Sequence, residues 1–300
     1  MDATWDCIVV GGGAAGLSAA LALGRARRRT LVVDAGRPSN LPAEGIGGLL
    51  GHDHRPPADL YAAGRAELAT YPTVEVRAGE VTDGEAADGG GFALAVSADG
   101  RTERQRARRV LLATGMDYRV PDVPGLAERW GRTAFHCPFC HGWEVRERPL
   151  CVLGVAHAAE RALMLRAWSD DVTLLADGAG LAPDDEQRLR DAGVTVDARP
   201  VAAVRDDAVA FADGAERPCG GVLVAATLHQ RSELARRLGA EVQPPGPLAH
   251  DALVVDAQWQ TTVPGLYAAG DAASHMPSVA NAIAGGATAA AMLVRGLMVG

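Results

Sequence analysis

The chain contains no lysine, since all 29 of its basic residues are arginine. Without a side-chain amine for a Schiff base, pyridoxal phosphate chemistry of the usual kind is excluded. No apolar run reaches the length of a membrane span. The N-terminus is acidic and leads directly into an expected strand, so we expect no signal peptide. A reducing, cytoplasmic location is the default expectation.

Positive charge is also not in excess, because the formal net charge is −8 at pH 7. This balance gives no reason to expect nucleic acid as a partner. Hydrophobic residues make up 48% of the 300 residues and charged residues 22%. That composition is typical of a globular protein with room for two domains.

Cysteine is scarce, and only Cys137 and Cys140 form a C-x-x-C pair. The simplest reading of such a pair is half of a zinc site, which needs two further ligands at suitable spacing. The other cysteines stand alone and form no second pair, at Cys7, Cys151 and Cys219. We therefore favour redox chemistry over zinc binding and expect no metal site.

The residues around this pair predict how it works. Pro138 suits the first turn of a helix, and a helix start there would place Cys137 near the positive end of the dipole. That position lowers the pKa of a thiol and favours the reactive thiolate. His136 and His141 flank the pair, so a proton carrier is within reach of either sulfur.

A nucleotide-binding turn is indicated near the N-terminus. Residues 6–10 read as a buried strand, and a helical pattern follows the sequence Gly11-Gly12-Gly13-Ala14-Ala15-Gly16. In G-x-G-x-x-G the first glycine allows a tight turn, the second lets a pyrophosphate approach, and the third lets the helix pack closely. Ala14 and Ala15 lie at the helix N-terminus, whose free N–H groups bind phosphates. A second strand ends at Asp34, where a carboxylate can bind a ribose hydroxyl.

Further cofactor contacts are expected from loops and strand ends. A buried strand over 110–113 ends in Ala113-Thr114-Gly115, and we interpret the arginine-rich run 101–109 before it as a strand edge and turn. Near the C-terminus a strand ends in Gly270-Asp271, which can direct a carboxylate at a ribityl chain or phosphate. Asn40, in the Gly- and Pro-rich loop 36–57, and His275 are additional candidates.

A second strand–turn–helix–strand unit begins near residue 150. The sequence therefore predicts an α/β protein with two Rossmann-like nucleotide-binding domains of the three-layer ββα type. Pro121, Pro124 and Gly125 mark one boundary, and a proline-rich piece at 244–247 looks like the return linker.

Taken together, these motifs resemble the low-molecular-weight thioredoxin reductase family of flavoproteins over essentially the whole chain. The resemblance implies a discontinuous FAD-binding domain, 1–116 and 247–300, with an inserted pyridine-nucleotide-type domain, 117–246, that carries the C-x-x-C. It also implies FAD as cofactor and a homodimer. Cys140 would lie against the flavin and Cys137 would exchange with substrate. His141 stands where the reductases carry an aspartate as proton carrier.

Two departures from the family concern the second nucleotide site. The glycines of its G-x-G-x-x-A motif align with Leu153 and Val155, and the motif's alanine with Ala158. Residues that follow the next strand, 176–180, contain an aspartate and none of the arginines that hold the 2′-phosphate in the reductases. We expect this ligand site to be degenerate.

These departures, with His-Cys-Pro-Phe-Cys-His-Gly, resemble the dithiol oxidase branch of the family, whose members close disulfides in sulfur natural products such as gliotoxin and holomycin. The leading expectation is oxidation of a small dithiol, with electrons passing through the cysteine pair and FAD to dioxygen. The alternative is an NADPH-dependent thioredoxin-disulfide reductase. A third reading is a non-catalytic redox sensor.

Overall fold

The computed structural model describes residues 4–274 and 276–299, and His275 lies outside the described residues. It divides into two compact units. The first comprises the described residues through Ser39, residues 57–118 and those from Thr227 onward, and the second comprises residues 40–56 and 119–226. The chain thus returns to the first unit near residue 226 and not near 246, because Leu228 and Leu238 pack into the first unit's core with Ile8.

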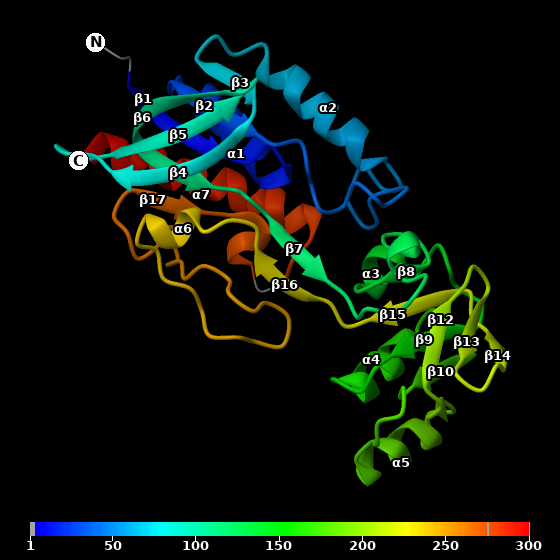
Figure 1. Cartoon of the computed structure of the whole chain (residues 1–300). Helices are drawn as coiled ribbons and strands as arrows, with labels where there is room; N and C mark the ends of the chain where they lie inside the picture. Colours follow the sequence, from blue (N-terminus) through cyan, green and yellow to red (C-terminus); the bar gives the residue numbers. More distant parts are fainter. Residues whose placement is uncertain (1–3, 275, 300) are drawn as a thin grey trace. The chain divides into compact units, whose positions relative to one another are not determined.

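The first unit is built on a seven-stranded sheet in the order β3-β2-β1-β6-β5-β4, with β17 paired to β6 (Figure 1). The parallel strands are β1 (Trp5–Val10), β2 (Thr30–Asp34), β3 (Val74–Ala78), β6 (Arg101–Leu112) and β17 (Leu266–Ala268). An antiparallel extension consists of β4 (Glu80–Ala86) and β5 (Phe92–Ala98). The run 101–109 is therefore not a turn but the first part of β6, because it pairs along its length with β5.

Helices α1 (Ala14–Arg25) and α7 (Val279–Val299) pack side by side in the first unit (Figure 1). Val9 and Leu111 point from the sheet into the core that contains Leu23 of α1 and Leu293 of α7. Alternate strand residues such as Ile8 face the opposite core, as the period of a strand requires. The smaller elements of this unit are α2 (Pro57–Leu68), α6 (Leu234–Arg237) and η2 (Gly270–Ala273).

The second unit has a five-stranded parallel sheet in the order β11-β10-β9-β15-β8. Its strands are β8 (Ala134–Phe135), β9 (Leu150–Leu153), β10 (Val172–Leu175), β11 (Thr195–Asp197) and β15 (Gly221–Val224). One face packs on α4 (Ala158–Leu165) and α5 (Pro183–Asp191), and the other on the antiparallel β12 (Val201–Val204), β13 (Ala208–Phe211) and β14 (Glu216–Pro218). The short η1 (Ala127–Arg129) and α3 (Pro138–His141) complete it.

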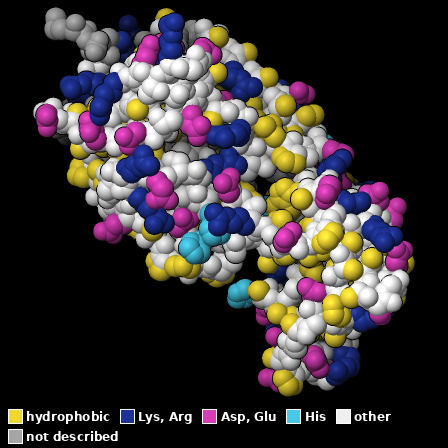
Figure 2. Space-filling view, in the orientation of Figure 1, with side chains coloured by type: hydrophobic (Ala, Val, Ile, Leu, Met, Phe, Trp, Pro, Cys, Tyr) yellow, Lys and Arg dark blue, Asp and Glu magenta, His cyan; other side chains and the backbone are white. Residues whose placement is uncertain are grey.

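Two strands lie where the chain passes between the units, β7 (Met116–Arg119) and β16 (Thr227–Gln230), and they pair with each other. The predicted α/β class with two Rossmann-like units is confirmed. None of the helices in the described part of the chain is long and apolar enough to cross a membrane. Arginine and acidic side chains are interspersed over the face shown in Figure 2.

Candidate active site and cofactor site

The cysteine pair lies at the start of α3. Cys137 is the N-cap residue, with extended backbone angles (φ −124°, ψ 111°), and Pro138 is the first helical residue. This confirms the predicted helix start. The two sulfur atoms are 2.6 Å apart, and the Cys140 thiol donates toward Cys137 Sγ. A disulfide has an S–S distance of about 2.05 Å, so the pair is placed for reversible closure.

The surroundings of Cys137 favour its thiolate. The hydrogen bond from the Cys140 thiol, with contributions from the backbone N–H groups of Cys140 and Phe139, lowers the pKa of Cys137 to about 7. Burial opposes this shift. Because α3 is a single turn, these local donors and not an extended helix dipole stabilise the thiolate.

His141 lies directly after the pair, with its ring stacked on Phe135 at a centroid distance of 5.8 Å. Burial lowers the pKa of His141, while the Glu144 carboxylate and backbone groups of Gly131 and Cys137 oppose the shift. Neither ring nitrogen makes a well-aligned hydrogen bond within the described part of the chain. His141 is therefore mostly neutral at pH 7, and the ring nitrogen that carries no proton can act as an acceptor.

His136 stacks on Trp130 with ring centroids 5.7 Å apart. Burial, followed by the neighbouring His141 and Arg161, lowers the pKa of His136 to about 4. At pH 7 this ring is neutral and a weak base. The contact with Trp130 supports packing as one of its roles, and its part in proton transfer stays a prediction.

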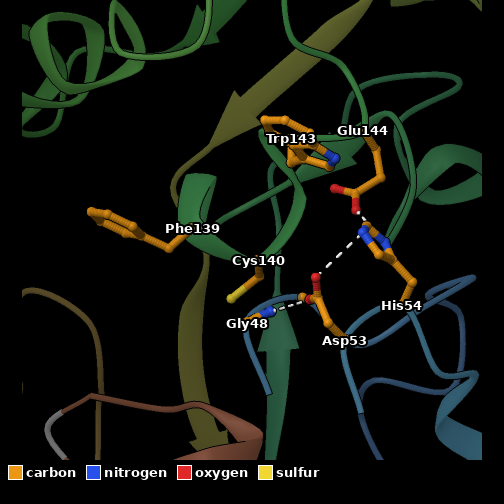
Figure 3. Close-up of a pocket in the computed structure, with 8 residues that line it drawn as sticks. Gly48, Asp53, His54, Phe139, Cys140, Trp143 and Glu144 are labelled. Atoms are coloured by element: carbon orange, nitrogen blue, oxygen red, sulfur yellow. Dashed lines mark hydrogen bonds and ion pairs between the residues drawn. The ribbon is translucent and has the colours of Figure 1, made fainter. Parts of the chain in front are cut away.

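A cavity of about 270 Å³ opens beside Cys140 (Figure 3). Phe139 and Trp143 contribute exposed aromatic surface, 72% and 57% accessible respectively. The remaining lining residues come from the loop at 47–54 and from the segment after α3: Gly47, Gly48, Asp53, His54 and Glu144. A Cβ on Gly47 would lie 2.4 Å from the Cys140 carbonyl oxygen, so the loop packs directly on the cysteine turn.

The polar wall of this cavity is formed by Asp53, His54 and Glu144 (Figure 3). His54 Nδ1 lies 3.2 Å from Glu144 Oε1, and its Nε2 lies 3.4 Å from Asp53 Oδ2. The Gly48 N–H donates to Asp53 Oδ1 at 2.8 Å. Sequence analysis missed His54 and Glu144, because only folding of loop 40–56 onto α3 brings them together.

The first glycine turn fits a dinucleotide. Gly11 has φ +111°, and a Cβ there would lie 2.2 Å from the Ala113 carbonyl oxygen. A Cβ on Gly16 would lie 1.8 Å from the Gly11 oxygen, whereas one on Gly13 would meet nothing within 4 Å. The turn therefore leaves open space at Gly13 for a pyrophosphate. Gly13 caps α1 without a side-chain hydrogen bond, which leaves the N–H groups at Ala14 and Ala15 available.

The acid at the end of β2 lies next to this turn. A Cβ on Gly12 would meet Asp34 Oδ2 at 2.4 Å, and the Asp34 side chain is only 12% exposed. The Gly36 N–H donates to Asp34 Oδ1 at 2.8 Å, which orients the carboxylate. This placement fits a ribose hydroxyl as the partner.

The C-terminal Gly-Asp turn also reaches the start of α1. Gly270 has φ +74°, and a Cβ there would lie 2.9 Å from the Ala15 Cβ. Asp271 Oδ2 accepts a 2.9 Å hydrogen bond from the Tyr118 hydroxyl, and burial raises the pKa of Asp271. A mostly buried carboxyl beside a dinucleotide turn fits the hydroxyls of a ribityl chain.

The structure gives fewer contacts that bear on the other predicted cofactor residues, which are Asn40, Ala113, Thr114 and Gly115. Ala113 donates from its N–H to Val10 at 2.8 Å, and Gly115 adopts φ +65°, so Ala113-Thr114-Gly115 continues β6 at the strand ends. Asn40 belongs to the second unit. The cofactor roles of these residues stay predictions.

The second nucleotide turn differs from the sequence-based account in one respect. The Leu153 side chain is 2% exposed and packs in the core, so it does not obstruct a ligand. Val155 is 38% exposed, and Gly154 (φ +87°) has open space around it. Glu160 lies in the first turn of α4, and Asp177 accepts from the Val201 N–H at 2.7 Å. The Glu160 carboxylate lies 3.2 Å from Arg188 Nη1, so this turn carries one ion-paired acid and one acid bonded to the backbone.

Comparisons with known proteins agree with this geometry. Residues 5–286 match the family model of the pyridine nucleotide-disulphide oxidoreductases. A thioredoxin reductase, tcpT, from Claviceps purpurea is 32% identical over 96% of this chain and 92% of its own length. The crystal structure of an oxidoreductase from Agrobacterium tumefaciens superposes with a TM-score of 0.93 at 35% identity, over 99% of both chains. The crystal structure of HlmI gives 0.89 at 37% identity, over 98% of this chain and 93% of HlmI.

The chain therefore belongs to the pyridine nucleotide-disulphide oxidoreductase family. Within that family it is a thioredoxin reductase-like redox enzyme that acts on thiols and disulfides, and its cofactor is FAD.

Proposed function

We propose that this enzyme is an FAD-dependent dithiol oxidase that closes an intramolecular disulfide in a small dithiol. The observation that carries the proposal is the Cys137–Cys140 pair, in which Cys137 has a pKa of about 7. The aromatic surfaces of Phe139 and Trp143 beside the pair suit a compact organic substrate such as a sulfur-containing natural product. We also propose that the enzyme is a cytoplasmic homodimer.

The thiol chemistry starts from the disulfide form of the pair. One substrate thiolate attacks Cys137 Sγ, the Cys137–Cys140 bond breaks, and Cys140 leaves as a thiolate. The second substrate thiol loses its proton and attacks the substrate sulfur of the mixed disulfide, which releases Cys137 as a thiolate. Two protons and two electrons have then left the substrate, and the electrons reside on the cysteine pair.

Protons released in these steps need an acceptor near the sulfurs. His141 is mostly neutral at pH 7, so its unprotonated ring nitrogen can take the proton of the second substrate thiol. Glu144 stabilises the resulting imidazolium and contacts His54, which faces the cavity. This gives the proton a route from the pair toward solvent.

FAD bound in the first unit would supply the two-electron acceptor chemistry that links the reduced cysteine pair to dioxygen, with hydrogen peroxide as the product. Gly11, Gly13 and Gly16 would hold this cofactor, Asp34 would bind its ribose and Asp271 its ribityl chain. Asp177 and the lack of an arginine in 176–180 support the absence of a nicotinamide requirement, because the segment that follows β10 offers a phosphate no positive charge.

Steady-state turnover tests this function. With a small dithiol and air, and no nicotinamide, we expect one hydrogen peroxide for each disulfide formed, and no turnover by Cys137→Ser. Turnover that requires NADPH and consumes a thioredoxin disulfide would identify a reductase. An intact flavin that reacts with neither would leave only a sensor role.

A further inference from the structure

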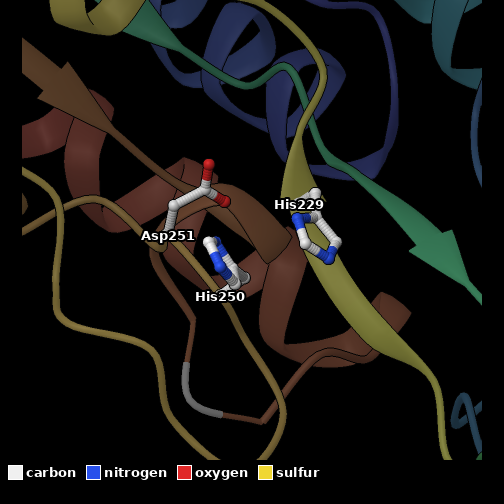
Figure 4. A group of neighbouring side chains, drawn as sticks. All are labelled: His229, His250 and Asp251. Carbon is white, nitrogen blue, oxygen red and sulfur yellow. The ribbon is translucent and has the colours of Figure 1, made fainter.

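Two histidines and an aspartate that play no part in the proposed reaction meet in the first unit (Figure 4). His229 lies on β16, and His250 and Asp251 lie on the segment that runs beside it. One potential ligand atom from each residue lies within 4.8 Å of the other two. Within the described part of the chain, this is the one such group of three or more potential ligands.

Backbone hydrogen bonds fix this juxtaposition. The His250 N–H donates to the Leu228 carbonyl oxygen at 2.8 Å, and the Leu228 N–H donates to Leu248 at 2.9 Å. The register places the two imidazole rings face to face, with centroids 4.7 Å apart and planes inclined by 22°. Backbone pairing therefore brings His229 and His250 next to each other, and the rotamer of each side chain sets where its ring nitrogens lie.

Asp251 is buried and already oriented as a metal ligand is. Its Oδ1 accepts from the Gln230 N–H at 2.8 Å, and its Oδ2 lies 3.3 Å from Arg236 Nη2. Each carboxylate oxygen keeps a lone pair beyond these contacts, and outer contacts of this kind fix the direction of a ligand. Arg236 competes for the same charge, but its side chain is 47% exposed and can turn toward solvent.

We propose that His229, His250 and Asp251 form a site for one divalent transition-metal ion, with zinc the best match. Two imidazole nitrogens and one carboxylate oxygen are ligands that zinc accepts, with a water at the fourth position. Zinc–nitrogen bonds of about 2.0–2.1 Å require the ligand atoms to draw closer than they are here. His250 is exposed and can supply that adjustment by rotating.

A bound ion would tie β16 to the segment at 248–251, at the point where the chain re-enters the first unit. The expected role is structural, and it is independent of the dithiol oxidase proposal. It departs from the sequence-based expectation of no metal site. That expectation was drawn from the cysteines and the histidines that flank the C-x-x-C, and His229 and His250 are too far apart in sequence to form a recognised motif.

Isothermal titration of the chelator-treated holoenzyme with Zn²⁺ tests the proposal, with the cysteine pair kept as a disulfide so that its thiols do not bind metal. We expect one site per chain. His250→Ala and His229→Gln should each weaken binding at least about tenfold, whereas His157→Ala, an exposed histidine of the other unit, should not. Co²⁺ titration should give tetrahedral absorption bands that His250→Ala removes.

Two results would overturn the site: no binding of Zn²⁺ at millimolar concentration, or binding that both histidine variants leave unchanged. Because His250 is exposed, its variant should fold and retain FAD. Retained flavin absorbance in the same samples separates a lost metal site from a lost fold.

Discussion

The Tyr118 hydroxyl donates a 2.9 Å hydrogen bond to Asp271 Oδ2. It joins β7 to the Gly-Asp turn beside the N-terminus of α1. Burial raises the pKa of Asp271, and the tyrosine hydroxyl partly offsets this shift by stabilising the carboxylate. The hydrogen bond thus orients a mostly buried carboxylate that we propose as a contact of the cofactor.

We expect Tyr118→Phe to weaken FAD binding by about tenfold, the equivalent of roughly 1.4 kcal/mol for a lost hydrogen bond to a charged group. Fluorescence titration of the apoprotein with FAD measures the dissociation constant of each variant. Tyr71→Phe, a tyrosine whose hydroxyl contacts exposed Arg25, is the matched control. If Tyr118→Phe and the wild type bind FAD with equal affinity, the proposed contact between Asp271 and the cofactor is contradicted.

Asp271→Asn should separate stability from function. The folded-state pKa of Asp271 is raised, so its charge costs the apoprotein stability, and this cost grows as pH rises through that pKa. Removing the charge should raise the melting temperature of the apoprotein at pH 7 by about 2 °C or more, while FAD affinity falls. Calorimetry at pH 4 and pH 7 checks the direction of this effect. The increase in melting temperature should be smaller at pH 4, because more of the wild-type Asp271 is protonated there.

Cys137 should be the sulfur that reacts first in the reduced enzyme. Its thiolate fraction, followed by iodoacetamide labelling and peptide mass spectrometry, should rise with pH around a midpoint near 7. In Cys140→Ala the midpoint should move up toward the ordinary value of 9.0, because the donated hydrogen bond is lost. Preferential labelling of Cys140 at pH 7 would reverse the roles assigned to the two sulfurs.

His141→Gln should slow dithiol oxidation by on the order of 10²-fold, a typical contribution of general base catalysis. Activity should fall on the acid side of the wild-type profile, where His141 is protonated and cannot accept a proton. Glu144→Gln removes the carboxylate that raises the His141 pKa, so this acid limb should move to lower pH. Glu147→Gln is the control. If the acid side of the pH–rate profile stays at the same pH in Glu144→Gln, the coupling of Glu144 to His141 is contradicted.

Gly16→Ala should abolish FAD binding, because its Cβ would lie 1.8 Å from the Gly11 carbonyl oxygen and push α1 away from the turn. Gly180→Ala, whose Cβ meets nothing within 4 Å, should purify yellow. The ratio of flavin to protein absorbance gives the result. A yellow Gly16→Ala protein would contradict the assignment of this turn to the cofactor site.

Local patterns were sufficient to predict the first nucleotide turn. Gly11 and Gly16 are required by short-range geometry, and Pro138 starts α3 for the same kind of reason. The interpretation of residues 101–109 was right in expecting a strand and wrong in expecting an edge and a turn, because pairing with β5 overrides an exposed, arginine-rich composition. Leu153 was placed at the ligand site because an alignment assigns a position and says nothing about which face a strand residue occupies.

Residues brought together by tertiary contacts left no sequence signal. His54 reaches Glu144 only because loop 40–56 packs on α3, and the separation of the two residues along the chain matches no motif. The same holds for His229 and His250, which pair through the register of β16 with the segment beyond α6. A histidine in a loop carries no pattern until its neighbours in space are known.

The most direct test of the central claim is the source of the electrons that reduce the flavin. Anaerobic stopped-flow, at matched concentrations of a small dithiol and of NADPH, follows the loss of flavin absorbance. The dithiol should bleach the flavin rapidly. NADPH should act slowly or not at all, because two or three lost hydrogen bonds to its phosphates, each worth roughly 1.5–3 kcal/mol, weaken binding by about a thousandfold or more. On readmission of air, hydrogen peroxide should appear in step with disulfide. Rapid bleaching by NADPH, with efficient turnover of a thioredoxin disulfide, would contradict the oxidase and identify a reductase.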